Sequence, residues 1–243
     1  MKKLVPKAIT FDVYGTILDS HGCWDRWYEK FMERKGYTGM TPKEAVARWE
    51  AIQFEYLKGP YVPHYELKRN TFRMACSEFG WDIDADDVEN FSHGLDIVPA
   101  FPDSRKAIEE LRKYTKVVTL TNVPNELVEK SFNAAGIEVD RILTSQDAQN
   151  YKPKKEVFLY SQKVLGLGVD ELLHAAFGFL YDIVPATALG YRTVWINRLG
   201  IPRLADVKEK YLCGDLETLV ILIKGMAKID EENEAAEAAG EIR

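Results

Sequence analysis

Short apolar runs alternate with amphipathic segments along most of this chain. The runs are rich in β-branched and aromatic residues, as strands are, and lie at 7–13, 116–122, 141–145, 172–179 and 192–197. Between and after them, apolar residues recur at helical spacing in segments 104–114, 125–136, 154–166, 184–190 and 216–228. Strands that alternate with helices form a parallel sheet with helices on both faces, because the crossovers are right-handed. The pattern therefore predicts an α/β fold with a Rossmann-like parallel sheet.

The stretch between residues 24 and 95 interrupts this alternation and shows helical spacing only. Trp24, Trp27 and Phe31 fall on one helical face, and similar spacing predicts further helices at 46–57 and 71–79. No strand is needed in this stretch, so an all-helical insertion follows the first strand. We therefore expect an α/β core formed by residues 1–20 and 99–228, a helical cap at 21–98 and an acidic tail at 229–243.

The charge of the chain is uneven. The 243 residues have a formal net charge of -6, and positions 230–243 contain six acidic residues and one basic residue. The rest of the chain is therefore close to neutral. Because a nucleic-acid-binding protein needs a basic face, we expect no nucleic-acid partner.

The cysteines and the N-terminus bear on the compartment. Cys23, Cys76 and Cys213 are few and far apart, which predicts neither a disulfide framework nor a zinc site. The basic N-terminus is followed by a short apolar run that ends at Asp12, unlike a signal peptide. No run approaches the roughly 18 apolar residues of a membrane span. We expect a soluble, cytoplasmic protein with no membrane contact.

Polar side chains follow the predicted strands at the points where those strands end. They are Asp12, Tyr14 and Thr16 after the first strand, Thr121 and Asn122 after the second, Lys152 after the third, and Tyr181 and Asp182 after the fourth. In an open parallel sheet, ligands bind beyond the carboxyl ends of the strands. We therefore expect these side chains to converge on one site that the helical insertion can cover.

Four separated motifs carry a resemblance to a known family. They are FDVYGTILD (11–19), TLTN (119–122), NYKP (150–153) and YDIVPATALGYRTVWINR (181–198). In this order and spacing, they resemble the haloacid dehalogenase superfamily, and most closely its L-2-haloacid dehalogenase branch. The resemblance covers about residues 5–225 and implies an α/β core with a helical cap, a small carboxylate substrate, no cofactor and a homodimer.

The resemblance assigns roles around the first strand. Asp12 matches the nucleophile, a carboxylate that can attack carbon and form an ester. Lys152 matches the lysine that keeps this nucleophile ionised, since a nearby cation lowers the pKa of an aspartate. Thr16 matches the residue that supports the loop after the nucleophile. The alternatives are a strand-end aspartate that caps a turn and an ordinary surface lysine.

Further roles follow from the other motifs. Thr121 and Asn122 match a pair that binds the substrate carboxylate, although a plain strand-end turn is an alternative. Asp182 matches the acid that pairs with the lysine and orients the hydrolytic water. Tyr181, its neighbour in the motif, is expected to contact the substrate.

The sequence departs from the phosphatases of the superfamily. They carry a second aspartate two residues after the nucleophile, where this chain has Tyr14. They also use two acids in the last motif to hold Mg²⁺, and the first of these positions is Phe177 here. We therefore expect no metal, and a phosphatase is a minor alternative.

The sequence also departs from the dehalogenases. Their halide-binding arginine on a cap helix aligns with Glu50, and their halide-contacting asparagine aligns with Phe179. A carboxylate repels a departing halide. If Arg48 turned inward instead, it would supply the missing cation.

These departures favour a different leaving group for the same reaction. Glu50 suits an amine, as in the ring opening of a cyclic amino acid by azetidine-2-carboxylate hydrolases, which are similar proteins. An aromatic wall formed by Tyr14, Trp49, Phe177 and Phe179 would then surround the cationic nitrogen. The alternatives are 2-haloacid dehalogenation with a rearranged halide site, and a binding protein on a hydrolase fold that has lost activity.

Overall fold

The computed structural model describes residues 3–239. Its centre is a five-stranded sheet in the order β2-β1-β3-β4-β5, in which every pair of neighbours is parallel. The strands are β1 (Ala8–Phe11), β2 (Lys116–Thr119), β3 (Leu172–Ala176), β4 (Arg192–Ile196) and β5 (Tyr211–Cys213). Residues of β1 and β3 are completely buried, as expected for central strands that helices cover on both faces. The predicted α/β fold class is confirmed.

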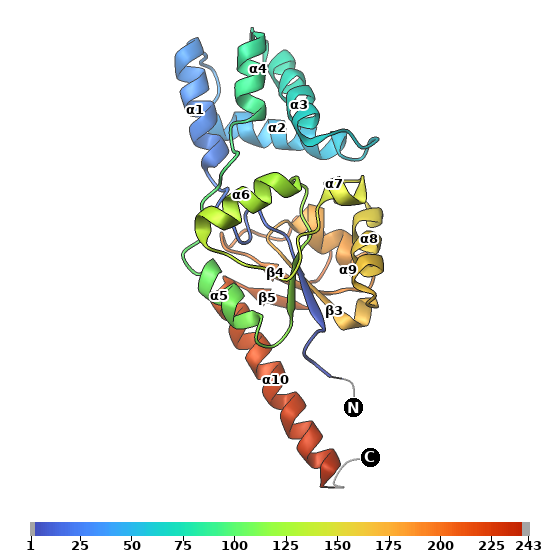
Figure 1. Ribbon diagram of the computed structural model, residues 1–243. Coiled ribbons are helices and arrows are strands. Elements are labelled where there is room, and N and C mark those ends of the chain that lie inside the picture. Colours follow the sequence, from blue (N-terminus) through green and yellow to red (C-terminus); the bar gives the residue numbers. More distant parts are fainter. Residues whose placement is uncertain (1–2, 240–243) are drawn as a thin grey trace.

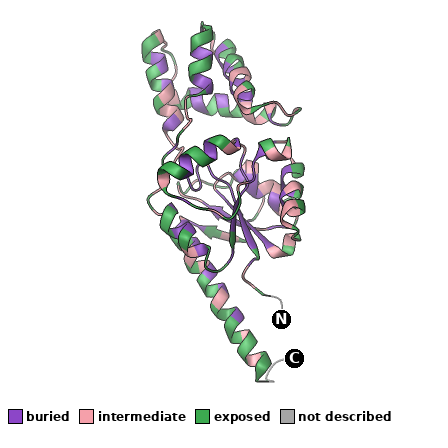
Figure 2. Cartoon of the chain, in the orientation of Figure 1, coloured by how far each residue is buried: buried purple, intermediate pink, exposed green. Residues whose placement is uncertain are grey.

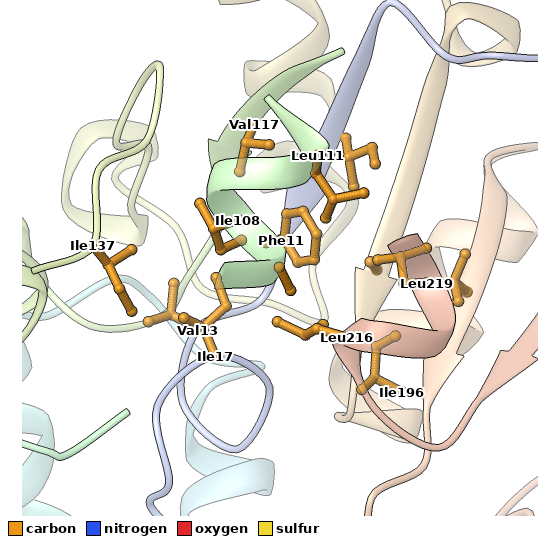
Figure 3. Close-up of a cluster of buried hydrophobic side chains, with 14 of the residues drawn as sticks. Phe11, Val13, Ile17, Ile108, Leu111, Val117, Ile137, Ile196, Leu216 and Leu219 are labelled. Atoms are coloured by element: carbon orange, nitrogen blue, oxygen red, sulfur yellow. The ribbon is translucent and has the colours of Figure 1, made fainter. Parts of the chain in front are cut away.

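Helices cover both faces of the sheet (Figure 1). They are α5 (Ser104–Leu111), α6 (Asn125–Ala135), α7 (Ser145–Ala148), α8 (Lys155–Leu165), α9 (Val184–Ala188) and α10 (Leu216–Ala238), with a 3-10 turn at Val169–Glu171 and a π-helical turn at Phe179–Ile183. One apolar cluster joins α5 and α10 to β1, through Ile108, Leu216 and Phe11 (Figure 3). A second cluster lies on the other face and includes Phe158 of α8 and Ala186 of α9.

Four helices between β1 and α5 form a separate layer beyond the strand ends (Figure 1). They are α1 (Cys23–Lys35), α2 (Pro42–Tyr56), α3 (His64–Phe79) and α4 (Ala85–Ser92). Their core is largely aromatic and includes Tyr28, Trp49, Phe72 and Phe91. The rings of Phe72 and Phe91 stack with centroids 4.1 Å apart. We call α1–α4 the helical cap.

Two details of the sheet differ from the sequence prediction. The segment 141–145 is not a strand, because only isolated bridges join Arg141 to Val118 and Thr144 to Thr121. The edge strand β5, which the sequence pattern did not predict, pairs with β4 instead. The sheet therefore has its fifth strand at the opposite edge from the predicted one.

The acidic segment at the C-terminus is structured as far as residue 239. Helix α10 continues to Ala238, so residues 229–238 extend the closing helix, and only residues 240–243 of the predicted tail lie outside the described part. Both oxygens of Asp230 accept hydrogen bonds from the backbone N–H of Leu4, and one also accepts from Val5, at 2.7–3.0 Å. Most of the last turns of α10 are exposed (Figure 2). The predicted tail is therefore, in large part, a helix attached to the N-terminal segment.

The structure also bears on the three cysteines and on membrane-spanning helices. Cys23, Cys76 and Cys213 are buried free thiols. Within residues 3–239, no helix has the length and apolar character needed to cross a membrane.

Candidate active site

A buried ion cluster lies at the carboxyl ends of β1 and β3. The ammonium of Lys152 donates to Asp12 Oδ1 at 2.9 Å and to Asp182 Oδ1 at 2.5 Å. The side chains of Lys152 and Asp182 are each 1% exposed, whereas Asp12 is 12% exposed. The structure thus brings together the three charged residues that sequence reasoning singled out, and leaves Asp12 the most accessible of them.

Asp12 is fixed by its own backbone and by Thr16. Its backbone N–H donates to Ala175 O on the neighbouring strand at 3.1 Å. The hydroxyl of Thr16 donates to Asp12 Oδ2 at 2.8 Å and accepts the N–H of Phe177 at 2.8 Å. Since the hydroxyl has one proton, the bond from Phe177 directs that proton to Asp12. Thr16 therefore orients the carboxylate.

Asn122 is tied to the lysine. Its Oδ1 accepts the backbone N–H of Lys152 at 2.8 Å, and its Nδ2 donates to the carbonyl of Lys152 at 3.0 Å. From the sequence, this amide is expected to bind the substrate carboxylate, and in the structure it forms these two hydrogen bonds with the Lys152 backbone. Thr121 lies beside it, almost completely buried, with its hydroxyl 3.4 Å from the N–H of Val123.

Two carboxylates share one ammonium in this cluster, and their pKa values move apart. Burial raises the pKa of Asp12, and the charge of Asp182 adds to this effect, while Lys152 and Thr16 oppose it. Burial also acts on Asp182, but Lys152 and His174 outweigh it and lower the pKa of this carboxyl. Burial disfavours the charged ammonium of Lys152, yet the two carboxylates raise its pKa. Asp182 is thus the more firmly ionised of the pair.

His174 is a member of this cluster that sequence reasoning missed. It is completely buried in β3, with Nε2 3.0 Å from Asp182 Oδ1 and Nδ1 2.9 Å from Thr10 Oγ1. Because an ionised carboxylate only accepts hydrogen bonds, Nε2 is the donor. The signal was available: a lone histidine in the apolar run LLHAA (172–176) needs a polar partner inside the fold.

A cavity of about 980 Å³ opens above the ion cluster, between the strand ends and the helical cap. All the predicted site residues except Thr16 line it: Asp12, Tyr14, Trp49, Glu50, Thr121, Asn122, Lys152, Phe177, Phe179, Tyr181 and Asp182. The walls are contributed by β-strand ends on one side and chiefly by α1, α2 and α3 on the other. The volume is that of a typical small-molecule site.

Glu50 and Arg48 of α2 point in different directions. The guanidinium of Arg48 pairs with both carboxylate oxygens of Glu78, at 2.5 and 2.7 Å, where both side chains are about half exposed. Glu50 lines the cavity, where burial raises its pKa and Lys68 lowers it. Arg48 also borders the cavity, but its guanidinium is paired with Glu78, which does not line the cavity.

The four residues of the predicted aromatic wall, Tyr14, Trp49, Phe177 and Phe179, all line the cavity, and three of the rings also pack against partners within the fold. The ring of Trp49 lies 4.5 Å from the ammonium of Lys68, a cation of the protein itself. Phe179 is buried against Trp195, with ring centroids 4.8 Å apart. Phe177 packs edge-on against His21 at 4.4 Å. The pattern of aromatic residues alone could not indicate these partners, and a wall around a substrate cation stays a prediction.

The donor set at the strand ends does not fit Mg²⁺. This ion requires oxygen ligands in near-octahedral arrangement, but the ammonium of Lys152 already lies against one oxygen of each carboxylate. Two residues after Asp12, Tyr14 offers a phenol whose pKa burial raises further. Among residues 3–239, no group of three or more His, Cys, Asp or Glu side chains could hold a metal.

Known proteins are similar to this chain in sequence and fold. Residues 6–175 match the haloacid dehalogenase-like hydrolase family. Haloacetate dehalogenase H-2 of Moraxella sp. (strain B) is 27% identical over 82% of this chain and 88% of its own length. The (S)-2-haloacid dehalogenase of Pseudomonas sp. (strain YL) is 28% identical over 80% of this chain and 84% of its own.

Solved structures show the same fold. An L-2-haloacid dehalogenase aligns with a TM-score of 0.78 at 23% identity, covering 90% of this chain and 99% of that one. The Xanthobacter autotrophicus L-2-haloacid dehalogenase with chloropropionic acid covalently bound aligns with a TM-score of 0.76 at 19% identity, covering 91% and 99%. By its sequence match over residues 6–175, this chain belongs to the haloacid dehalogenase-like hydrolases.

Proposed function

We propose that this hydrolase displaces a substituent from C2 of a small carboxylic acid without a metal ion. An oxygen of Asp12 attacks C2, the bond from C2 to the leaving group breaks with its electron pair, and an aspartyl ester forms. Water then attacks the ester carbonyl carbon, which releases a 2-hydroxy acid and restores Asp12. The observation that carries this proposal is the ammonium of Lys152, which bridges Asp12 and Asp182 at the base of the cavity.

The contacts of Asp12 suit the first step. A carboxylate has about four lone-pair positions, and Lys152 and Thr16 use one on each oxygen. The side chain is 12% exposed, and it lines the cavity. The two hydrogen bonds therefore favour the ionised form of Asp12 and orient it, and the carboxylate can still reach a carbon atom.

The charges of Lys152 and Asp182 suit the second step, the hydrolysis of the ester. As water adds to the ester, negative charge develops on the former Asp12 carbonyl oxygen, where Lys152 or Thr16 donates a hydrogen bond. Asp182 is ionised at ordinary pH because its pKa is lowered, so it can accept a proton from water. His174 and Lys152 fix the orientation of this base.

A halide is the first candidate for the leaving group. The curated relatives are named as haloacetate and 2-haloacid dehalogenases. We propose 2-haloacids as substrates, and a carboxylate-binding role for Thr121 at the strand end. A second candidate, ring opening of a cyclic amino acid such as azetidine-2-carboxylate, is favoured by Glu50, whose carboxylate lines the cavity. A homodimer stays a prediction.

One assay separates these candidates. With excess chelator present, halide release from 2-chloropropionate is compared with ring opening of azetidine-2-carboxylate. We expect halide release to be faster, to survive the chelator and to disappear in Asp12→Asn. The matched control is Asp86→Asn, at an exposed position of α4, which should behave as wild type.

A labelling experiment tests the ester itself. In a single turnover in heavy-oxygen water, the label should enter the carboxylate of Asp12 and be absent from the first molecule of product. Label that enters the product directly would show that water attacks C2 and would contradict the nucleophilic role of Asp12. A requirement for Mg²⁺ would contradict the reaction class.

A further inference from the structure

Lys68 of α3 is a buried cation in the cap wall of the cavity that the proposed reaction does not use. The residue is 8% exposed and lines the cavity. Within residues 3–239, no hydrogen bond or ion pair engages its ammonium; its contacts are two aromatic rings. A buried ammonium without a paired anion is costly, so a fold that keeps one at a cavity wall leaves room for an anion from outside.

The two rings belong to Trp24 of α1 and Trp49 of α2. The ammonium lies 4.3 Å from the first ring centroid and 4.5 Å from the second. The rings are 4.8 Å apart, and the Trp49 N–H donates to Thr71 at 3.1 Å, which fixes that ring. Cation–π contacts steady the ammonium without neutralising it. Since Lys68 and both tryptophans line the same cavity, the uncovered side of the ammonium faces that space.

Glu50 is the nearest opposite charge, but it does not pair with Lys68. The two side chains influence each other electrostatically, yet no ion pair within 4.0 Å joins them in the described residues. Burial lowers the pKa of Lys68 to about 7, and Glu50 only partly opposes this. An anion that bound against the ammonium would raise that pKa and replace the water that Lys68 has lost.

The position of Lys68 connects it with the strand ends. His64 lies four residues earlier on the same face of α3, also lines the cavity and meets the backbone of Asn122. The Nδ1 atom of His64 is buried, and no hydrogen-bond partner for it lies among residues 3–239. Lys68 therefore stands about one helical turn from the point where the cap meets the Thr121–Asn122 loop.

We propose that Lys68, between Trp24 and Trp49, is a second anion-binding site of the cavity. It binds a negative charge that the substrate carries, or releases, in addition to its C1 carboxylate. The ligand chemistry is a compact anion, and its two sources are a second carboxylate on the substrate and a released halide. The link to substrate rests on the proposed function, but anion binding as such does not.

Binding of the free anions tests the site without turnover. Sodium bromide and sodium succinate are titrated separately into the full chain, with binding followed by the linewidth of the bromide or succinate NMR signal. We expect saturable binding of at least one anion, weakened about tenfold or more in Lys68→Met and retained in Lys68→Arg. Lys30→Met, at an exposed position of α1, is the matched control.

Each outcome decides. Lys68-dependent binding of bromide supports a released halide, and Lys68-dependent binding of succinate without bromide supports a second carboxylate. If neither anion binds the wild type, or if both bind Lys68→Met as well as wild type, the site is refuted. Circular dichroism checks that the variants are folded, and Lys68→Arg tests the charge requirement if Lys68→Met is not. If Asp12 is labelled in heavy-oxygen water but no Lys68-dependent anion binding is found, only the anion site is refuted. If anions bind at Lys68 but Asp12 is not labelled, the proposed reaction is refuted.

Discussion

Gly178 is the position at which the geometry of the site can be disturbed by a single methyl group. It follows β3 and precedes the turn that carries Asp182, with φ −62° and ψ 94°. A side chain is therefore allowed by the backbone at this position. A Cβ atom added there, however, would approach Asp182 Oδ2 more closely than the 3.0 Å below which real Cβ atoms are essentially never found. Gly178→Ala thus tests the placement of one carboxylate rather than the backbone.

The carboxylate has little freedom to retreat. Asp182 is 1% exposed, and its Oδ1 accepts from Lys152 at 2.5 Å and from His174 at 3.0 Å. A shift of Asp182 also pulls on the ammonium that faces Asp12. Active-site groups work when held within about 0.5 Å of their productive positions, and a displacement of about 1 Å can cost roughly 100-fold in rate. We expect kcat for 2-chloropropionate to fall by about that factor.

The assay distinguishes this mechanism from general damage. Because Asp182 is proposed to activate water, the ester at Asp12 should accumulate in Gly178→Ala and be visible by mass spectrometry of the intact protein. The control is Gly225→Ala in α10, where, among the described residues, no atom beyond the neighbouring backbone of the helix lies within 4 Å of the added Cβ. It should keep full activity and raise the free energy of unfolding by roughly 0.5–1 kcal/mol. Wild-type kcat in Gly178→Ala, with no trapped ester, would refute the role of Asp182 and its rigid placement.

Three other measurements test separate contacts. His174→Leu removes a hydrogen bond to Asp182, so ester hydrolysis should slow about tenfold in single turnovers. His174→Gln should restore part of the lost rate. An unchanged rate in His174→Leu would contradict a positioning role for His174. Asp230→Ala leaves the N–H groups of Leu4 and Val5 without their acceptor, which should cost about 1–3 kcal/mol in urea unfolding; an unchanged midpoint would contradict the attachment of α10. Asp12 must be ionised to attack, and burial raises its pKa above the ordinary 3.8, so ester formation should be lost as pH falls through a value above 3.8; a lower limb would contradict the raised pKa.

The sequence could predict the arrangement of the ion cluster because a parallel sheet places its strand ends on one edge. Asp12 follows a largely apolar run, and Asp182 follows another, so their convergence needs no knowledge of side-chain packing. The edge strand β5 was missed because its sequence carries no clear pattern. It has three residues, of which only Cys213 is buried, and so short a segment has no measurable period.

The residues that were missed or misassigned depend on packing between elements. His174 and Lys68 are polar residues in a strand and a helix, and only tertiary contacts show that both are buried. Asn122 follows a strand end as predicted, yet its amide bonds to the Lys152 backbone. The contacts of Asn122 with Lys152 and of His174 with Thr10 join residues 30 and 164 positions apart, beyond the reach of any local pattern. Motifs therefore pointed to Asp12, Thr16, Lys152 and Asp182, but not to His174 or Lys68.

The charges in the cap wall show why the alignment of Glu50 with the family's arginine was not enough to infer the leaving group. Two residues apart on a helix, Arg48 and Glu50 cannot face the same way, and the pair between Arg48 and Glu78 turns the guanidinium toward α3. The glutamate at an arginine position therefore does place a negative charge in the cavity. It does not leave the cavity without a cation, because Lys68 enters the same wall from α3. A wall formed by three helices carries the sum of their charges, so the leaving group has to be inferred from Glu50 and Lys68 together.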